Sequence, residues 1–348
     1  MRYLAGLVAV ACFAAEPTPQ ALIESGHFKR ARAILEPRYR ANPKDPETLC
    51  LLSQLKQKWR DYATALDLAE KALAVDPKNP RYHLRVADAA GALAGKSGVF
   101  RQLSLGRRFK KEVDATLALD PNNAEALSML MGFYVMAPGV MGGDKVKAQG
   151  IPGRIMHIDP VDGYFAQADL AWFLKQKVDL EDLFRKAVEA RPASYAARIK
   201  LANYYASGSV NKFGDAEKHA REAIRIEPER AGARNVLAFV LVEEKKWVEL
   251  DAALAESEKA LPDNLGPYCS AAARCLWRNV EAARAEGYLR KYLSQEPEPD
   301  EATPSHAHRL LGGALHREGR NAEAIAELQT AVKLDPNSPA KEELKKIK

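Results

Sequence analysis

Three histidines near the C-terminal end, His306, His308 and His316, are the first candidates for chemistry, because imidazole binds zinc and transfers protons near neutral pH. His308 and His316 are eight residues apart, a spacing that would place them on one face of a helix. Zinc-binding helices usually space their histidines by four residues and add carboxylate or thiolate ligands. The sequence has no His-Glu-x-x-His motif, and we therefore expect no metal site.

Other reactive patterns lack the context that their chemistry needs. Residues 90–97 read Ala-Gly-Ala-Leu-Ala-Gly-Lys-Ser, a loose version of the phosphate-binding loop. That loop follows a β-strand and opens a helix, whereas the apolar residues of 84–87 have helical spacing and residues 90–97 would end that helix. No Cys-x-x-Cys pair and no Gly-x-Ser-x-Gly turn is present. The sequence predicts no catalytic residue and no cofactor, and we expect a protein that is not an enzyme.

The charge of the chain is balanced. Its 52 basic and 46 acidic side chains give a net charge of +6 that is spread over most of the 348 residues, so the total does not indicate nucleic acid binding. Hydrophobic residues make up 47%, which is enough for a continuous core, while only 7% are aromatic, as is typical of helical proteins rich in alanine and leucine.

Prolines that end helices recur at a nearly constant interval. The successive spacings are 34, 44, 39, 32, 36, 34, 35 and 39 residues. Several of these prolines follow an acidic residue, as in Asp76-Pro77, where the acid marks a helix end rather than a catalytic group. This period predicts a chain of repeated helix pairs. The recurring prolines are Pro43, Pro77, Pro121, Pro160, Pro192, Pro228, Pro262, Pro297 and Pro336.

Small side chains recur at fixed places before these prolines, as at Ala65 and Ala72, twelve and five residues ahead of Pro77. Seven residues make two helical turns, so both positions lie on one stripe where another helix must approach closely. Ser53, twenty-four residues before the same proline, would face them. We expect each unit to be two antiparallel helices, and the units to stack because none buries its apolar face alone.

Residues 47–79 and 308–337 carry enough of this pattern to resemble tetratricopeptide repeats, and the resemblance extends over about residues 18–337. The first segment has Leu52, Ser53, Tyr62, Ala65, Ala72, Asp76 and Pro77 in the matching places. The resemblance implies an all-α, right-handed superhelical solenoid of about nine helix pairs over residues 17–337, closed by a polar capping helix at 338–348. It also implies a scaffold that binds another protein or peptide.

Two units within residues 80–160 are longer than the others. The first has a basic run, which is either a solvated helix face or a surface for an anionic partner. The second has an Ala-Pro-Gly-Val-Met-Gly-Gly turn, which is either a structural bend or a loop that contacts a ligand. Together they are similar to a group of bacterial tetratricopeptide proteins without an assigned function. The run contains Lys96, Arg101, Arg107, Arg108, Lys110 and Lys111, and the turn contains Pro138, Gly139, Gly142 and Gly143.

The resemblance also implies where a partner lies, since the first helices of successive units line the concave groove of such a superhelix. Alignment on the prolines places these residues near the groove: Glu47, Gln54, Arg81, Arg85, Asp88, Arg198, Asn203, Arg234, Asn235, His306 and Arg309. The chaperone-binding members of the family have a lysine and an asparagine at the start of their carboxylate clamp. Here Asn203 holds the second place but Ile199 holds the first, so we do not expect chaperone binding.

The first residues differ from the rest of the chain. After Arg2, an uncharged run from Tyr3 to Ala15 is too short to span a bilayer but fits the core of a signal peptide. We expect residues 1–16 to be an export leader, with lipidation of Cys12 as one alternative and an apolar cap on a cytosolic array as the other.

Three functions are consistent with these observations. The favoured one is a non-enzymatic adaptor in a bacterial cell envelope, in the periplasm or anchored by a lipid at Cys12, with no nucleic acid partner. The second is a small-molecule-binding or enzyme-associated protein that uses residues 96–153. The third is a cytosolic assembly factor.

Overall fold

The computed structural model describes residues 17–347, and all the regular structure of that part is helical. The first helices of successive units are α1 (Pro19–Ser25), α3 (Pro46–Lys58), α5 (Pro80–Ala94), α7 (Ala124–Met136), α10 (Pro160–Leu174), α12 (Tyr195–Ala206), α14 (Ala231–Glu243), α16 (Gly266–Arg278) and α18 (Pro304–Arg317). The second helices are α2 (Phe28–Ala41), α4 (Tyr62–Val75), α6 (Val99–Leu119), the broken pair α8 (Lys145–Gln149) and α9 (Ile151–Ile158), α11 (Leu180–Ala190), α13 (Phe213–Ile226), α15 (Trp247–Ala260), α17 (Ala282–Tyr292) and α19 (Asn321–Leu334). The helix α20 (Ala340–Ile347) packs against α19.

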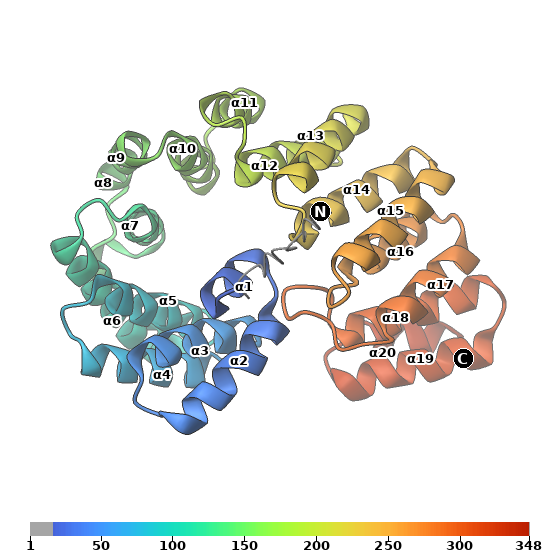
Figure 1. The fold of residues 1–348 in the computed structure, drawn as a ribbon, viewed down its shortest axis with the longest axis horizontal. Helices are drawn as coiled ribbons and strands as arrows, with labels where there is room; N and C mark the ends of the chain where they lie inside the picture. The colour runs from blue at the N-terminus through green and yellow to red at the C-terminus, as the bar shows by residue number, and fades with distance from the viewer. Residues whose placement is uncertain (1–16, 348) are drawn as a thin grey trace, which may run out of the picture.

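Figure 1 shows these pairs stacked in chain order around a curved path, with the first helices toward its centre. The expected all-α solenoid of about nine helix pairs with a C-terminal capping helix is confirmed. In residues 17–347, no helix is both long and apolar enough to cross a membrane.

The two helices of a unit meet at a seam of small residues. Ala65 and Ala72 of α4 are fully buried, and the Ser53 hydroxyl of α3 donates to the Ala65 carbonyl at 2.7 Å. At the equivalent crossing of the last unit, a Cβ added to Gly312 would lie 2.7 Å from Leu328 Cγ. The seam therefore leaves no room for larger side chains on the first helix.

The fourth unit departs from the pattern at both ends of its turn. After α7, the 3₁₀ turn η1 (Gly139–Met141) leads to Gly142 at φ 93°, and a Cβ on Gly143 would lie 1.8 Å from the Ala137 carbonyl oxygen, so only glycine fits there. Asp144 then caps α8 by accepting from the backbone N–H groups of Val146 and Lys147, both at 3.0 Å. Gly150 interrupts the second helix between α8 and α9.

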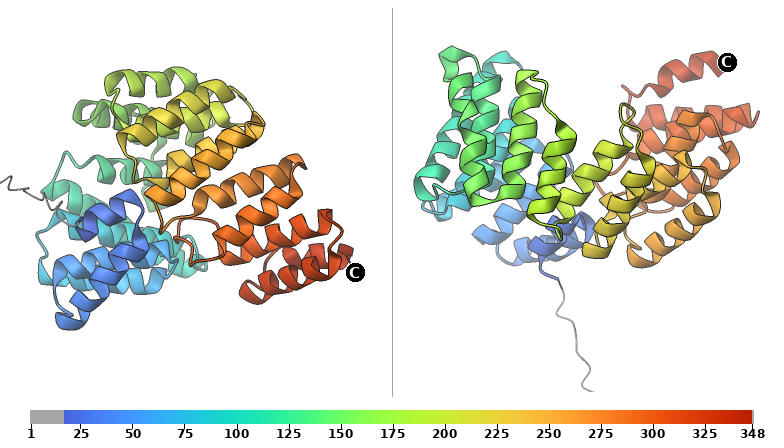
Figure 2. Two further views of the ribbon diagram at one scale, coloured as in Figure 1. Left: turned by 45° about the vertical axis from the view of Figure 1, so that its right-hand side comes forward. Right: turned by 90° about the horizontal axis from the view of Figure 1, so that it is seen from above.

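The curvature brings the first unit back against the sixth to ninth units, as Figure 1 and Figure 2 show for α1 and the start of α14. His27 Nδ1 donates to Asp263 Oδ2 at 2.8 Å, across 236 residues of sequence, and its Nε2 donates to the Glu229 carbonyl at 2.9 Å. Lys29 Nζ donates to the Asp263 carbonyl at 2.7 Å. We call this set, completed by Glu298, the closure contact.

Both ring nitrogens of His27 face acceptors, so the closure contact favours the doubly protonated imidazolium. The hydrogen bond to Asp263 is the main reason that the pKa of His27 is raised, and it outweighs the effect of burial. Glu298 is also buried here and accepts from the Lys29 backbone N–H at 3.2 Å. Burial raises the pKa of the Glu298 carboxyl to about 7, although Lys29 opposes the shift.

These two shifts predict that the closure contact is stronger in mild acid than in mild base. The contribution of His27 is complete below its ordinary pKa of 6.5 and is lost as the pH rises through its raised value. The closed form also keeps a proton on Glu298 that the open form releases above the ordinary pKa of 4.5, so closure weakens from there to about pH 7. Hydrogen exchange of α1 and α2, corrected for intrinsic rates, should be slower at about pH 5.5 than at about pH 8.

The variant Glu298→Gln tests the cause, because glutamine resembles the protonated carboxyl. We expect it to reduce the loss of protection at about pH 8, whereas His27→Gln should weaken protection at about pH 5.5. Equal corrected exchange of α1 and α2 in the wild-type chain at both pH values would contradict the prediction.

Candidate partner-binding surface

Four of the predicted groove residues, Glu47, Arg81, Arg85 and Asp88, lie in a ladder of charges that links the first helices of neighbouring units. Arg81 of α5 donates to Glu47 of α3 at 2.8 Å and to the Gln20 side chain of α1 at 2.5 Å. Arg85 donates to Asp88 on its own helix at 2.5 Å and lies 3.8 Å from Glu125 of α7. These side chains bond mainly to other residues of the array, so they help to hold neighbouring units in position.

Arg198 and Arg234 do not take the inner positions that alignment predicted. They occupy equivalent places on α12 and α14, and each donates to the carbonyl of the proline six residues earlier, Pro192 at 3.1 Å and Pro228 at 3.1 Å. The Arg198 guanidinium also lies 3.2 Å from His219 of α13, so it faces the second helix of its unit.

The remaining groove residues are separated along the array. Asn203 of α12 is exposed, and its amide donates to the Ile199 carbonyl of the same helix at 3.0 Å. Asn235 of α14 donates to Glu301 at 3.0 Å, close to the closure contact. Arg309 of α18 donates to Glu343 of α20 at 2.7 Å. The structure therefore does not bring the predicted residues together into one site.

A denser cluster, absent from the sequence prediction, lies on α14 and α16. The Arg274 guanidinium carbon lies 4.2 Å from the ring centre of Phe239 and 4.1 Å from that of Trp277. Arg274 and Arg278 both pair with the buried carboxylate of Glu243, Arg278 at 2.9 Å. Trp277 itself is 69% exposed. We call these five residues the arginine–tryptophan cluster.

The cluster continues into a pocket of about 270 Å³ between α16, α18 and α20. Leu310, Gly313 and Ile347 supply apolar surface, and Arg309, Arg317 and Lys346 line it with positive charge. Arg317 donates to the Leu276 carbonyl at 2.5 Å, which joins the pocket to the turn of α16 that carries Trp277. The pocket and the cluster together present aromatic, apolar and cationic groups on adjacent first helices.

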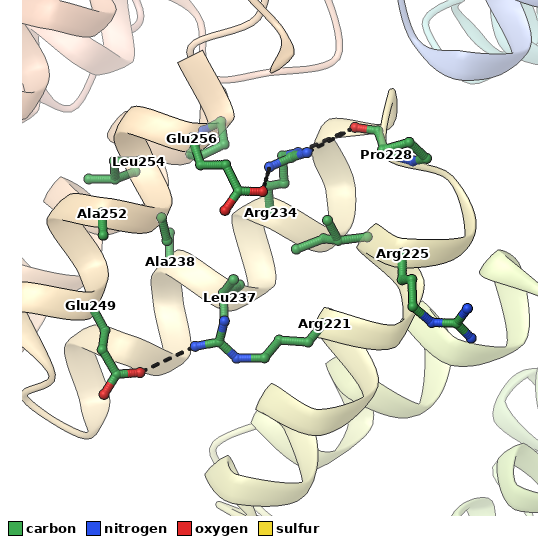
Figure 3. Close-up of a pocket in the computed structure, with 13 residues that line it drawn as sticks. Arg221, Arg225, Pro228, Arg234, Leu237, Ala238, Glu249, Ala252, Leu254 and Glu256 are labelled. Atoms are coloured by element: carbon green, nitrogen blue, oxygen red, sulfur yellow. Dashed lines mark hydrogen bonds and ion pairs between the residues drawn. The ribbon is translucent and has the colours of Figure 1, made fainter. Parts of the chain in front are cut away.

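A larger groove of about 560 Å³ opens between the second helices α13 and α15, over α14 (Figure 3). Ile224, Leu237 and Ala253 give it an apolar lining, and Arg221 pairs with Glu249 across it at 3.3 Å. Arg234 lies at its floor, 6% exposed, and its guanidinium is 3.8 Å from Glu256. The groove exists because α14 packs more closely on α16 than on its own second helix α15.

The predicted basic run lies on α6 and the turn before it. Lys110 pairs with Asp114 at 2.6 Å, and Arg108 lies 3.2 Å from the buried Glu112. In the described part of the chain, Lys96, Arg101, Arg107 and Lys111 form no ion pair. The run is therefore divided into two paired and four unpaired cations.

Two of the three candidate histidines have separate side-chain partners. His308 Nδ1 lies 2.6 Å from Glu327, and His316 Nδ1 lies 2.7 Å from Asn321. Burial lowers the pKa of His306. Within residues 17–347, no group of three His, Cys, Asp or Glu side chains is arranged to hold a metal ion.

Comparisons with known proteins bear on the repeat type. Residues 271–339 match a tetratricopeptide repeat model. This part of the chain is similar to tetratricopeptide repeats. Residues 40–136 match the model of regulator of microtubule dynamics protein 1-3. No curated protein compared with this chain matches it. The narrower resemblance to a bacterial group stays a prediction.

Several solved structures are similar to this chain at low sequence identity. Yeast Tom70 is similar over 94% of this chain and 86% of its own length, at 14% identity and a TM-score of 0.47. Human IFIT1, solved as a dimer with PPP-AAAA, covers 91% of this chain and 81% of its own, at 16% identity and a TM-score of 0.44. A tetratricopeptide repeat protein from Parabacteroides merdae covers 87% and 98%, at 14% identity and a TM-score of 0.42.

The structural role of Arg234 predicts a stability effect. Arg234→Met keeps most of the volume but leaves the Pro228 carbonyl without its donor, so we expect a loss of about 1–2 kcal/mol in the free energy of unfolding, measured by urea denaturation. Arg225→Met is the matched control. Within residues 17–347, Arg225 pairs only with Glu222 of its own helix, so its replacement should change stability by less than about 0.5 kcal/mol. Equal effects of the two variants would contradict this role.

Proposed function

We propose that this tetratricopeptide array is a non-enzymatic scaffold that binds an extended acidic segment of another protein on α14, α16 and α18. The observation that carries the proposal is Trp277, a large aromatic side chain that stays 69% exposed beside Arg274 and Arg278 of the same first helix, α16. Tryptophan and arginine are the residue types that contribute most to binding energy at protein interfaces. Burying Trp277 beneath a partner would remove apolar surface that the free chain leaves in water.

The charges around Trp277 support an acidic partner. Arg274 and Arg278 share the single carboxylate of Glu243, and Arg309 pairs with Glu343, while Arg317 has no carboxylate partner in the described residues. Four arginines thus face two carboxylates, so the surface keeps an excess of positive charge. Arginine accepts a carboxylate through two parallel hydrogen bonds, which would fix the register of an extended segment.

The arginine–tryptophan cluster is also held in place before any partner arrives. Arg274 is stacked between Phe239 and Trp277, and Glu243 beneath it is fully buried. A side chain fixed by stacking and by an ion pair loses little conformational freedom on binding. The cluster is therefore better suited to recognition than the exposed, singly bonded Asn203.

A small-molecule role for residues 96–153 has less support. A functional pocket there should contain a close pair of side chains with perturbed pKa values. In the described chain, Asp144 is the residue of this stretch with a shifted pKa, and its pKa is lowered chiefly by the backbone N–H of Lys147. That shift is explained by helix capping.

We further propose that residues 1–16 are an export leader and that the array works in a bacterial cell envelope. This part of the proposal rests on the uncharged run from Tyr3 to Ala15, which lies outside the described residues. The alternatives are a lipid anchor at Cys12 and retention in the cytosol.

Replacement of Trp277 tests the peptide site. Peptides selected from a random display library on the full chain should be rich in acidic residues, because the surface has excess positive charge. Trp277→Ala should weaken the selected peptides at least about tenfold, measured by fluorescence polarisation, since loss of a buried aromatic anchor costs more than about 1.4 kcal/mol.

Trp172→Ala is the matched control, because Trp172 on α10 is similarly exposed, at 76%, but lies outside the cluster. It should leave the affinity of the selected peptides unchanged. Selection of basic peptides, or equal binding by the Trp277→Ala chain, would reject this site.

An export leader at residues 1–16 would change the mass of the mature chain. The chain recovered from the envelope fraction of its native host should lack Met1 and the following residues up to a cleavage site near Ala15, or begin at a lipidated Cys12. Intact-mass measurement distinguishes these forms, and a chain that retains Met1 in the cytosolic fraction would reject export.

A further inference from the structure

Large apolar side chains are exposed together at one end of the irregular region. Phe100 in the first turn of α6 is 90% exposed, and Val140 in η1 is 96% exposed. Val99, Met136 and Val146 are also exposed. Monomeric proteins seldom expose a group of large apolar side chains, and such a group usually marks an interaction site.

The packing of α6 against the turn after α7 places the two segments that carry these residues next to each other. A Cβ on Gly106 would lie 4.0 Å from Met141 Cε, and Val99 is two helical turns before Gly106 on the same face of α6. The Asp144 N–H donates to the Tyr134 carbonyl at 2.8 Å, which fixes the turn against the end of α7. Figure 2 (right) shows the helices from α6 to α10 running side by side, with their ends at a common edge. We call this edge the apolar tip.

Positive charge surrounds the apolar tip. From residue 89 to residue 111 the sequence contains six basic and no acidic side chains. Residues 126–143 carry no charge, and Lys145 and Lys147 follow. Asp144 is the acidic residue at this edge, and its carboxylate is engaged in capping α8. Lys96, Arg101, Arg107 and Lys145 form no ion pair in the described chain, so their charge is available to an anionic surface.

We propose that the apolar tip docks on the surface of a bilayer that contains anionic lipids. Phe100 and Val140 protrude from a helix start and a loop, a shape that enters the boundary between headgroups and acyl chains. The flanking lysines and arginines reach lipid phosphates while their aliphatic stems lie along the apolar surface.

A bilayer fits this edge better than a protein partner does. A protein interface needs a complementary surface packed around each protruding group, and its hot spots lie in pockets that exclude water. The apolar tip is convex and presents separate side chains, whereas a fluid bilayer deforms around each of them. The tip is formed by α6 to α8 and the peptide site by α14 to α18, so the two proposals are independent.

Flotation with vesicles tests this docking. The full chain should float with vesicles of phosphatidylcholine that contain about 30% phosphatidylglycerol, and not with phosphatidylcholine alone. Binding should fall in about 0.5 M salt, because the screening length shortens to a few ångströms. Phe100→Ser with Val140→Ser should weaken binding at least about tenfold, since two exposed apolar anchors are lost.

Two further variants complete the design. Arg101→Glu with Arg107→Glu should also weaken binding to the anionic vesicles, whereas Val248→Ser, which changes an 85% exposed valine on α15, should leave it unchanged. All four changed residues of the tip are exposed, so the unfolding midpoint of each variant should match that of the wild-type chain.

Three results would overturn the proposal. If the wild-type chain bound neutral and anionic vesicles equally, the charges would have no role. If the Phe100→Ser, Val140→Ser chain bound anionic vesicles as strongly as the wild-type chain, the contact would lie elsewhere. Failure of the wild-type chain to float, with a crosslinked protein that is lost in the same double variant, would assign the edge to a protein partner instead.

Discussion

The close approach of two helices at a seam of small residues is the constraint on which the array depends. Ala65, Ala72 and Ser53 allow the backbones of α3 and α4 to come near enough for a side-chain hydroxyl to reach a carbonyl of the other helix. The distance between the two helices depends on the combined size of the two facing side chains, and alanine is not required at one particular position. Where Phe109 replaces the alanine of α6, Gly91 stands opposite it, and a Cβ there would lie 3.0 Å from the phenyl ring.

The outer groove and the arginine–tryptophan cluster occur where a large residue enters the seam and no glycine stands opposite it. Leu250 takes the alanine place on α15 and is fully buried, so α15 cannot approach α14 as other second helices approach theirs. The outer groove in Figure 3 follows from that separation, and so does the closer packing of α14 on α16. That packing places Arg274 of α16 over Phe239 and Glu243 of α14, which is the basis of the arginine–tryptophan cluster.

Local features of the fold were predictable from the sequence because their causes lie within a few residues. The proline period indicated the number of helix pairs, and the glycines at 142 and 143 marked the turn in the fourth unit. Arg198 and Arg234 were assigned to the wrong face, yet both stand six residues after a proline, as His83 does after Pro77. That spacing is a sequence signal for a side chain that satisfies the proline carbonyl.

The closure contact and the arginine–tryptophan cluster had no comparable signal, because they depend on distances that the whole superhelix sets. His27 meets Asp263 only if the intervening units together turn the chain through the required angle. One additional unit, or a seam widened in several units, would carry α1 past its partners while every individual pair still packed. The number and curvature of the units between α2 and α14 are therefore constrained by closure in addition to stacking. Since α1 has only seven residues and lacks a preceding helix pair in the described chain, closure also supplies contacts that an interior unit would receive from its neighbour.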